Sequence, residues 1–191
     1  MQVGKFFLVG FVIICTVIFL DQYTKWMIVE TALRLSGSAN LDFLQWFFTE
    51  KKLSFFVNER EVFRTAYLTH YLSFVVVWNQ GISFGMMDTN SPNMSLVFIA
   101  LSLCISMFML IWLALSVKRS VAICLGLIVG GALANVIDRI RFGAVADFID
   151  LHYYQYHWPA FNLADASISI GAMILILITF LGKKDSLPLE I

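Results

Sequence analysis

Two aspartates lie in segments whose apolar surroundings could turn a pair of carboxyl groups into a catalyst. Asp147 lies in the alternating apolar stretch 144–150, which predicts a short strand or a loop, and Asp165 opens a long apolar stretch. Two carboxyl groups a few ångströms apart share one proton, because their like charges disfavour double ionisation. One can then act as a base toward water while the other protonates a peptide carbonyl oxygen. From the spacing alone, the two residues also fit a helix cap and a loop hydrogen-bonding residue, and that alternative stays open.

The residues before Asp165 predict different roles for the two aspartates. Asn162 stands three positions earlier, which is the spacing between a helix N-cap and its first turn. In that turn the helix dipole favours an anion, so we expect Asp165 to be the base and Asp147 the acid. Coupled carboxyl groups titrate as a unit, and exchanging the two roles leaves the rest of the interpretation unchanged.

Other polar side chains occur inside or beside long apolar stretches, where each needs a partner or a cavity. Asp21 and Lys25 are four residues apart on one helical face, which fits either an ion pair or a site that positions substrate. Asn135, Asp138 and Arg139 form a polar face at the end of another stretch. We expect this trio to be structural, with Asp138 and Arg139 contacting different neighbours.

The composition shows what kind of chain must position these residues. The 191 residues are 60% hydrophobic and 14% charged, with a mean hydropathy of +0.82, which predicts an integral membrane protein. A bilayer core of ~30 Å needs about 20 apolar helical residues to cross it. Four stretches satisfy this requirement, at about 6–28, 94–116, 120–138 and 165–182. The 13 basic and 13 acidic residues balance, which argues against a nucleic-acid partner.

Basic residues predict the orientation of the four spans. They are Lys5 before the first span, Lys118 and Arg119 between the second and third, and Lys183 and Lys184 after the fourth. Positive charge is concentrated in cytoplasmic segments, so both termini are expected in the cytoplasm. The segments at about 31–93 and 139–164 then lie on the opposite, outer face, although the first carries basic residues of its own.

Local patterns predict further elements. Residues 72–78 are β-branched and aromatic enough for a strand, and residues 43–56 mix aromatic and charged residues as an interfacial helix does. Four aromatic residues between 153 and 158 fit a belt at the membrane surface. The third span carries a stripe of small residues, which predicts close packing of a neighbouring helix. The stripe consists of Gly126, Gly130 and Ala134.

Five blocks of residues resemble the successive signatures of one family. They are Asp21-Gln22-Tyr23-Thr24-Lys25, Asn79-Gln80-Gly81-Ile82-Ser83-Phe84-Gly85, Gly130-Gly131-Ala132-Leu133-Ala134-Asn135-Val136-Ile137-Asp138-Arg139, Val145-Ala146-Asp147-Phe148 and Phe161-Asn162-Leu163-Ala164-Asp165. In this order, on four spans, they resemble the lipoprotein signal peptidases (signal peptidase II), aspartic peptidases of the bacterial inner membrane.

The resemblance implies roles for particular residues. Asp147 and Asp165 correspond to the catalytic aspartates of the family. The residues that support the site or the substrate are, by the same resemblance, Asp21, Lys25, Asn79, Gly131, Asn135, Asp138, Arg139, Asn162 and Ala164. The implied fold is a mainly α membrane protein, with a bundle of four transmembrane helices, a small periplasmic cradle containing β-strands, and an interfacial helix.

The resemblance also implies the substrate and the setting. The enzyme would remove the signal peptide from a prolipoprotein that carries a diacylglyceryl cysteine, cutting just before that cysteine. It would act in contact with membrane lipid, as a monomer, near the periplasmic face of the inner membrane. Water is the nucleophile in an aspartate pair, so we expect no cofactor and no metal. His152 and His157, near Asp150, are not expected to be ligands.

Two features depart from the family pattern. Ala134 replaces the glycine that usually precedes the asparagine of the third-span block, and the outer loop at about 33–68 is longer than is common. The first change is conservative within a packing stripe. The second leaves the local structure of the loop and its motion undetermined by sequence.

Other functions remain to be distinguished. A transporter or lipid-binding scaffold could use the aspartates to carry protons or to bind a headgroup, and it would cleave nothing. A hydrolase with a serine or zinc-based motif is disfavoured, because neither Gly-x-Ser-x-Gly nor His-Glu-x-x-His occurs. Cys15, Cys104 and Cys124 lie in apolar runs and are expected in the core.

Overall fold

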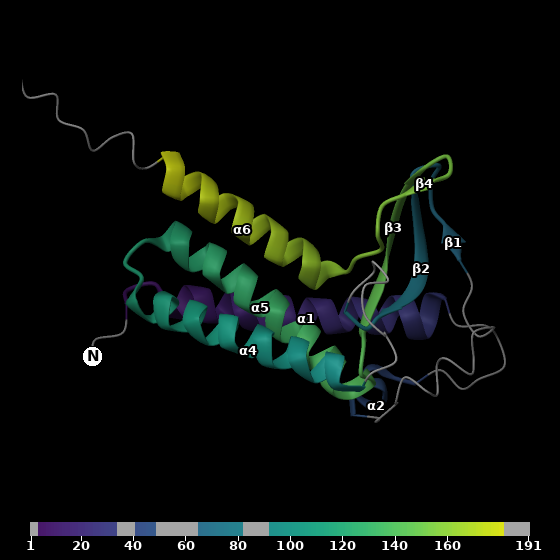
Figure 1. Ribbon diagram of the computed structural model, residues 1–191, viewed down its shortest axis with the longest axis horizontal. Coiled ribbons are helices and arrows are strands. Elements are labelled where there is room, and N and C mark those ends of the chain that lie inside the picture. The colour runs from purple at the N-terminus through teal and green to yellow at the C-terminus, as the bar shows by residue number, and fades with distance from the viewer. Residues whose placement is uncertain (1–3, 34–40, 49–64, 82–91, 182–191) are drawn as a thin grey trace, which may run out of the picture.

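The protein is a bundle of long helices with a small sheet at one end. The computed structural model describes residues 4–33, 41–48, 65–81 and 92–181. Within these ranges, four helices are long and apolar enough to cross a membrane. They are α1 (Phe7–Lys25) with its π-helical continuation η1 (Trp26–Ala32), α4 (Pro92–Leu115), α5 (Arg119–Phe142) and α6 (Leu163–Leu181). The helices lie side by side and the strands stand at one end of them (Figure 1), so the predicted fold class is confirmed.

Two helices extend beyond the predicted spans on the side of the sheet. The first continues past residue 28 to Ala32, and α5 continues past residue 138 to Phe142. Helix α5 ends at Gly143, whose φ of 78° is left-handed and whose N–H donates to the Arg139 carbonyl at 3.0 Å. Asp138 and Arg139 therefore lie on the helix itself, and its last turn carries their side chains toward the sheet.

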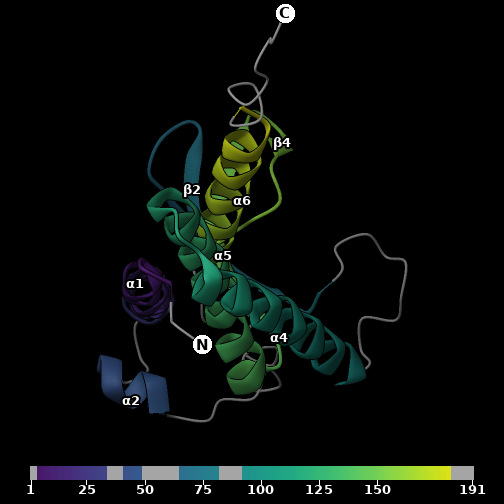
Figure 2. The ribbon, with the colours of Figure 1, turned by 90° about the vertical axis from the view of Figure 1, so that its left-hand side faces the viewer.

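Helix α5 is the centre of the bundle and packs against α1, α4 and α6 (Figure 2). The predicted stripe of small residues lies on the side of α5 that meets α1. A Cβ added at Gly126 would come within 2.8 Å of the Gly10 carbonyl oxygen, and one added at Gly130 within 2.8 Å of Val17 Cβ. The stripe thus allows the close helix approach that the sequence predicted.

Gly131 has the same role between α5 and α6, and this gives a stability prediction. A Cβ there would overlap the Ala164 carbonyl oxygen and come within 2.8 Å of Ile168 Cγ1. We expect Gly131→Ala to lower the free energy of unfolding by about 1–3 kcal/mol through overpacking, measured by thermal unfolding in detergent. Gly143→Asn is the control, because no described atom lies within 4 Å of a Cβ at Gly143 and Asn tolerates left-handed backbone. Equal losses in both variants would contradict the packing role.

The sheet is antiparallel, with the strand order β1-β2-β3-β4. Its strands are β1 (Ala66–Tyr67), β2 (Leu72–Asn79), β3 (Val145–Tyr153) and β4 (Tyr156–His157). The strand predicted at 72–78 is confirmed as β2, and the stretch around Asp147 is a strand rather than a loop. Strand β3 pairs with β2 so that Val77 lies opposite Asp147.

A short helix, α2 (Phe43–Phe48), forms the first part of the interfacial helix predicted at 43–56. Arg141, at the end of α5, holds it in place: its guanidinium donates to the Trp46 carbonyl and stacks 4.3 Å from the Trp46 ring. Residues 49–56, most of the long loop at 33–68 and the end of the second signature block, 82–85, lie outside the described residues.

Side-chain exposure corrects one prediction and agrees with another. Cys124 is buried, but Cys15 and Cys104 are exposed on outer faces of their helices, so the predicted core position is wrong for these two. An apolar residue of a membrane helix can face lipid as well as the core, and composition does not distinguish the two faces. The aromatic residues of 153–158 are exposed on the β3–β4 hairpin, as an interfacial belt requires.

Candidate active site

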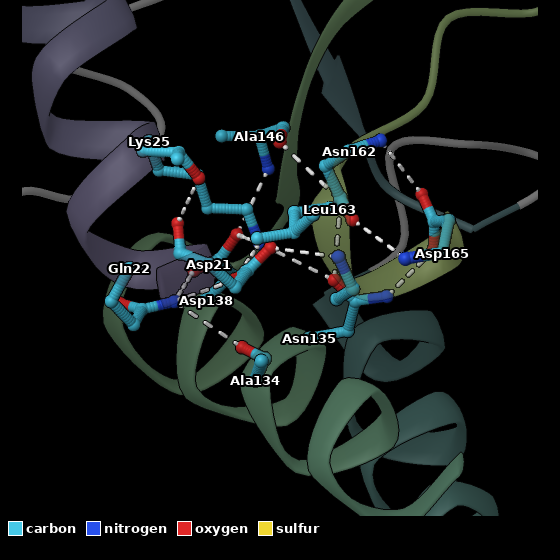
Figure 3. Close-up of polar contacts among 12 residues, drawn as sticks. Asp21, Gln22, Lys25, Ala134, Asn135, Asp138, Ala146, Asn162, Leu163 and Asp165 are labelled. Carbon is cyan, nitrogen blue, oxygen red and sulfur yellow. Dashed lines mark hydrogen bonds and ion pairs between the residues drawn. The ribbon is translucent and has the colours of Figure 1, made fainter. Parts of the chain in front are cut away.

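Asp165 is held in the first turn of α6 by a reciprocal cap. The Asn162 side-chain oxygen accepts the Asp165 N–H at 2.9 Å, and the Asp165 carboxylate accepts the Asn162 N–H at 3.2 Å. This is the capping-box arrangement, which satisfies two N–H groups that the helix start leaves free. Asn135 on α5 donates to the same carboxylate at 2.8 Å. Figure 3 shows Asn162, Asp165 and Asn135 converging from these elements.

Asp147 comes from β3 and is almost completely buried, with 2% of its surface exposed. Its carboxylate accepts hydrogen bonds from two side-chain amides: Asn162 at 2.8 Å and Asn79, at the end of β2, at 3.0 Å. The other end of the Asn79 amide accepts the Gly81 N–H at 2.9 Å. The Asn79 side chain therefore binds Asp147 and its own loop, which makes it a support of the site.

Asn162 is the residue that joins the two aspartates. Its amide nitrogen binds the Asp147 carboxylate, while its main-chain nitrogen and side-chain oxygen bind Asp165. One residue thereby binds both carboxyl groups, that of Asp147 through its side chain and that of Asp165 through its main chain, although one carboxyl group belongs to a strand and the other to a helix.

The two carboxyl groups also differ in their electrostatic surroundings. Burial raises the pKa of Asp147 to about 7, and the negative charge of Asp165 adds to the rise, while hydrogen bonds from Asn79 and Asn162 and the charge of Lys25 oppose it. Asp165 is only half-buried and lies in a helix first turn, where an anion is favoured. This arrangement fits a proton held on Asp147.

A buried ion cluster connects the helices beneath the two aspartates. Lys25 on α1 lies 2.7 Å from Asp21 and 2.7 Å from Asp138 on α5, and all three side chains are inaccessible to solvent. Asp21 also accepts the Ala164 N–H at 2.9 Å, and Asp138 accepts the Ala146 N–H at 3.1 Å. The cluster ties α1 and α5 to the start of α6 and the start of β3 (Figure 3). Between the two roles left open for Asp21 and Lys25, this burial favours the structural one.

Asn135 and Arg139 extend the network toward the aspartates. The Asn135 side-chain oxygen accepts from Lys25 at 3.3 Å and from Asn162 at 3.2 Å, so it relays the ion cluster to the pair. The Arg139 guanidinium lies 5.3 Å from the Phe98 ring and donates to the Asn135 carbonyl at 3.5 Å, and its charge interacts with those of Asp165 and Asp147. Asp138 and Arg139 thus contact different neighbours, as predicted.

An open cleft of about 790 Å³ lies over the sheet and gives access to Asp147. Its lining includes Asn79, Gly81, Trp158, Ser73, Asp150 and His157. These residues come from β2, the loop after it and the β3–β4 region. An extended peptide laid along it would pass Asp147.

Two residues of this region, Gln22 and Ser73, were not identified as site residues from the sequence. Gln22 donates to Asp138 at 2.8 Å and accepts from Arg141 at 2.9 Å, which joins the ion cluster to the anchor of α2. Ser73 donates to Asp150 at 2.7 Å. Gln22 lies in a signature block and could have been found there. Nothing in the sequence specified the strand register that pairs Ser73 with Asp150.

The comparison with protein families decides the classification. The family model described as signal peptidase (SPase) II matches residues 13–181, which is most of the chain.

The chain belongs to the signal peptidase II family.

Individual relatives agree with this classification. The chain is 46% identical over 106 residues to a lipoprotein signal peptidase of Anaplasma phagocytophilum, covering 56% of this chain and 67% of that protein. It is 43% identical over 114 residues to one of Aquifex aeolicus, covering 59% and 68%. The match to the Anaplasma marginale relative spans 60% of that protein's length. The chain is therefore an aspartic peptidase of the family that cleaves signal peptides from prolipoproteins.

Solved structures share the fold of this signal peptidase II family member. Two bacterial membrane enzymes superpose with TM-scores of 0.69 and 0.65, at 22% and 23% sequence identity. They cover 100% and 94% of this chain, and the chain covers 99% and 97% of theirs. The helices and the sheet therefore form one arrangement common to these enzymes, and the protein is a multi-pass membrane protein.

Proposed function

We propose that Asp147 and Asp165 are the catalytic pair of this enzyme and that they activate water to cleave a prolipoprotein just before a diacylglyceryl-modified cysteine. The main observation behind this proposal is that Asn162 donates hydrogen bonds to both carboxyl groups and so holds them as a pair. No covalent intermediate is needed, because the pair itself supplies a base and an acid.

The chemistry follows from the different environments of the two groups. Ionised Asp165 takes a proton from water as the oxygen attacks the scissile carbonyl carbon, and protonated Asp147 donates its proton to the carbonyl oxygen. The resulting diol collapses when Asp165 returns its proton to the departing nitrogen and Asp147 takes a proton back from a hydroxyl. Each carboxyl group ends in its starting state, so the pair is ready for another turnover.

The remaining predicted residues act as positioning residues in this proposal. Asn79, Asn135 and Asn162 orient the carboxylates through the hydrogen bonds described above. The ion cluster fixes the ends of α1 and α5, and Gly131 lets α5 approach Ala164 at the start of α6. A displacement of about 1 Å at either aspartate would disturb the geometry on which catalysis depends.

The proposed setting is the bacterial inner membrane, with both termini cytoplasmic and the aspartates near the periplasmic face. The basic residues at the turn between α4 and α5 support this orientation. The exposed aromatic residues of the β3–β4 hairpin lie where the headgroup region would be. A diacylglyceryl cysteine can be met only at such an interface, with its acyl chains in membrane lipid, and a monomer carries all the residues that the site requires.

The substrate proposal is tested by comparing two forms of one prolipoprotein. The purified chain is incubated with a diacylglyceryl-modified prolipoprotein and with the same protein lacking the lipid, and the products are mapped by mass spectrometry. We expect the lipidated form alone to be cut, with the lipid-bearing cysteine as the new first residue. Equal cleavage of both forms, or a cut elsewhere, would contradict it, and transport without cleavage would favour the transporter alternative.

The pH dependence of cleavage tests the assignment of acid and base. Because the pKa of Asp147 is about 7, its proton is present below that pH and is lost as the pH rises through it. Single-turnover rates are therefore expected to fall above about pH 7, approaching tenfold per pH unit, although the apparent value belongs to the coupled pair. A rate that rises with pH through this range would assign Asp147 as the base and contradict its role as the acid.

A further inference from the structure

Three side chains that could bind a metal ion lie together on the β3–β4 hairpin, apart from the catalytic pair. It consists of Asp150, His152 and His157, and we call it the Asp–His cluster. His152 and His157 are directly opposite each other in the pairing of β3 with β4, and their rings stack with centroids 5.2 Å apart. None of the three takes part in the proposed peptide hydrolysis, so their convergence needs a separate explanation.

The donor atoms of the cluster lie at distances close to those of a metal site. His157 Nδ1 is 2.9 and 3.0 Å from the two Asp150 carboxylate oxygens, and His152 Nδ1 is 3.5 Å from one of them. Ligand atoms of all three residues lie within 4.8 Å of one another. A tetrahedral zinc ion with bonds of about 2.0–2.2 Å places its ligands roughly 3.3–3.5 Å apart, which small side-chain rotations would reach here.

Two further features indicate that the cluster is prepared for a cation. His152 Nδ1 is buried and has no hydrogen-bond partner among the described residues, whereas buried polar atoms are normally paired. Ser73 donates to the Asp150 carboxylate at 2.7 Å, which orients it as the groups around a metal site orient its ligands.

We propose that Asp150, His152 and His157 bind one divalent transition-metal ion of the zinc class, with a remaining coordination position open toward the cleft. Both Asp150 and His157 line the cleft that leads to Asp147. A bound ion would fasten β4 to β3, the strand that carries the catalytic aspartate, and so fix the wall along which the substrate passes. This site is separate from the reacting atoms and adds no step to the hydrolysis.

The proposal is tested on the tag-free full chain in detergent, stripped of metal by chelation. Zn²⁺ is titrated in competition with a chromophoric chelator. We expect one ion per wild-type chain, and affinity lower by on the order of 100-fold or more in Asp150→Asn and His157→Asn. His70→Asn is the matched control, because it removes the third histidine of the chain and leaves the cluster intact. It is expected to bind as the wild type does.

Two further measurements distinguish a loss of metal binding from a failure of the variant to fold. Each variant must keep the melting temperature of the metal-free wild type, and Zn²⁺ should raise the melting temperature of wild type and His70→Asn only. In the wild type and in His70→Asn, but not in Asp150→Asn, Zn²⁺ should protect His152 and His157 from diethyl pyrocarbonate, while His70 of the wild type stays reactive. Absence of stoichiometric binding, absence of this protection, or unchanged binding in folded Asp150→Asn would overturn the proposal and leave an Asp150–His157 ion pair.

Discussion

Asp147→Asn is expected to slow single-turnover cleavage of a diacylated prolipoprotein by about 10²–10⁴-fold, the contribution of one positioned acid or base. Asparagine keeps the shape of the side chain but cannot give up a proton to the carbonyl oxygen and recover it. Asp165→Asn is expected to lose a similar factor, because the attacking water then lacks its base. Rates are measured with enzyme in excess over substrate, so that product release does not hide the chemical step.

Asp147→Asn is also expected to change how the stability of the protein depends on pH. In the folded protein the pKa of Asp147 is raised to about 7 from an ordinary 3.8, so the folded state holds a proton that the unfolded state has released between these values. Stability is therefore lost as the pH rises from about 4 to 7. Asp147→Asn lacks this loss, so its melting temperature should gain on that of the wild type as the pH rises from about 4 to 7. A variant that is inactive yet gains in this way is folded, which makes the loss of rate interpretable.

Lys25→Met is expected to destabilise the protein by about 3–5 kcal/mol, the cost of breaking a buried ion pair by removing one partner. Lys25 lies between Asp21 and Asp138, each at 2.7 Å, and none of the three is accessible to solvent. Methionine fills a similar volume, so the expected loss arises from two carboxylates left buried without a cation. It is measured by thermal or denaturant unfolding in detergent.

A triple variant separates charge from packing in this cluster. Asp21→Asn, Lys25→Met and Asp138→Asn together remove all three charges, and we expect them to recover much of the stability that Lys25→Met alone loses. Lys118→Met, at an exposed position, is the surface control and should change little. If the triple variant were less stable than Lys25→Met, the hydrogen bonds of Asp21 and Asp138 to the starts of α6 and β3 would matter more than the charge balance.

Much of the fold could be predicted because membrane spans and helix caps depend on residues that are close together in the sequence. Length and apolarity are sufficient to find the four helices, and the spacing of Asn162 and Asp165 predicted the cap that the structure contains. The strand at 72–78 followed from its β-branched and aromatic residues. The helix ends were less predictable, since α5 passes residue 138 with polar residues whose partners lie on other elements, such as Gln22 of α1 and Trp46 of α2 for Arg141.

The convergence of distant segments could not be predicted in this way. Asp147 and Asp150 are three residues apart, and a regular strand would point them to opposite faces. Both nevertheless line one cleft. The pairing of β2 with β3 also shifts register between Phe74 and Val77, with the extra residue in β2. Neither feature follows from a local pattern in the sequence. For the same reason, no local pattern indicated that His152 and His157 would share Asp150.

The most direct test of the catalytic pair is a double-variant cycle in single-turnover cleavage of the diacylated prolipoprotein. Wild type, Asp147→Asn, Asp165→Asn and the combined variant are compared at one pH after each is shown to be folded. If the two carboxyl groups act as a unit, the combined variant should be about as slow as either single variant, because removing one already disables the pair. Near-normal cleavage by either single variant, or a combined loss equal to the product of the two single losses, would contradict the account.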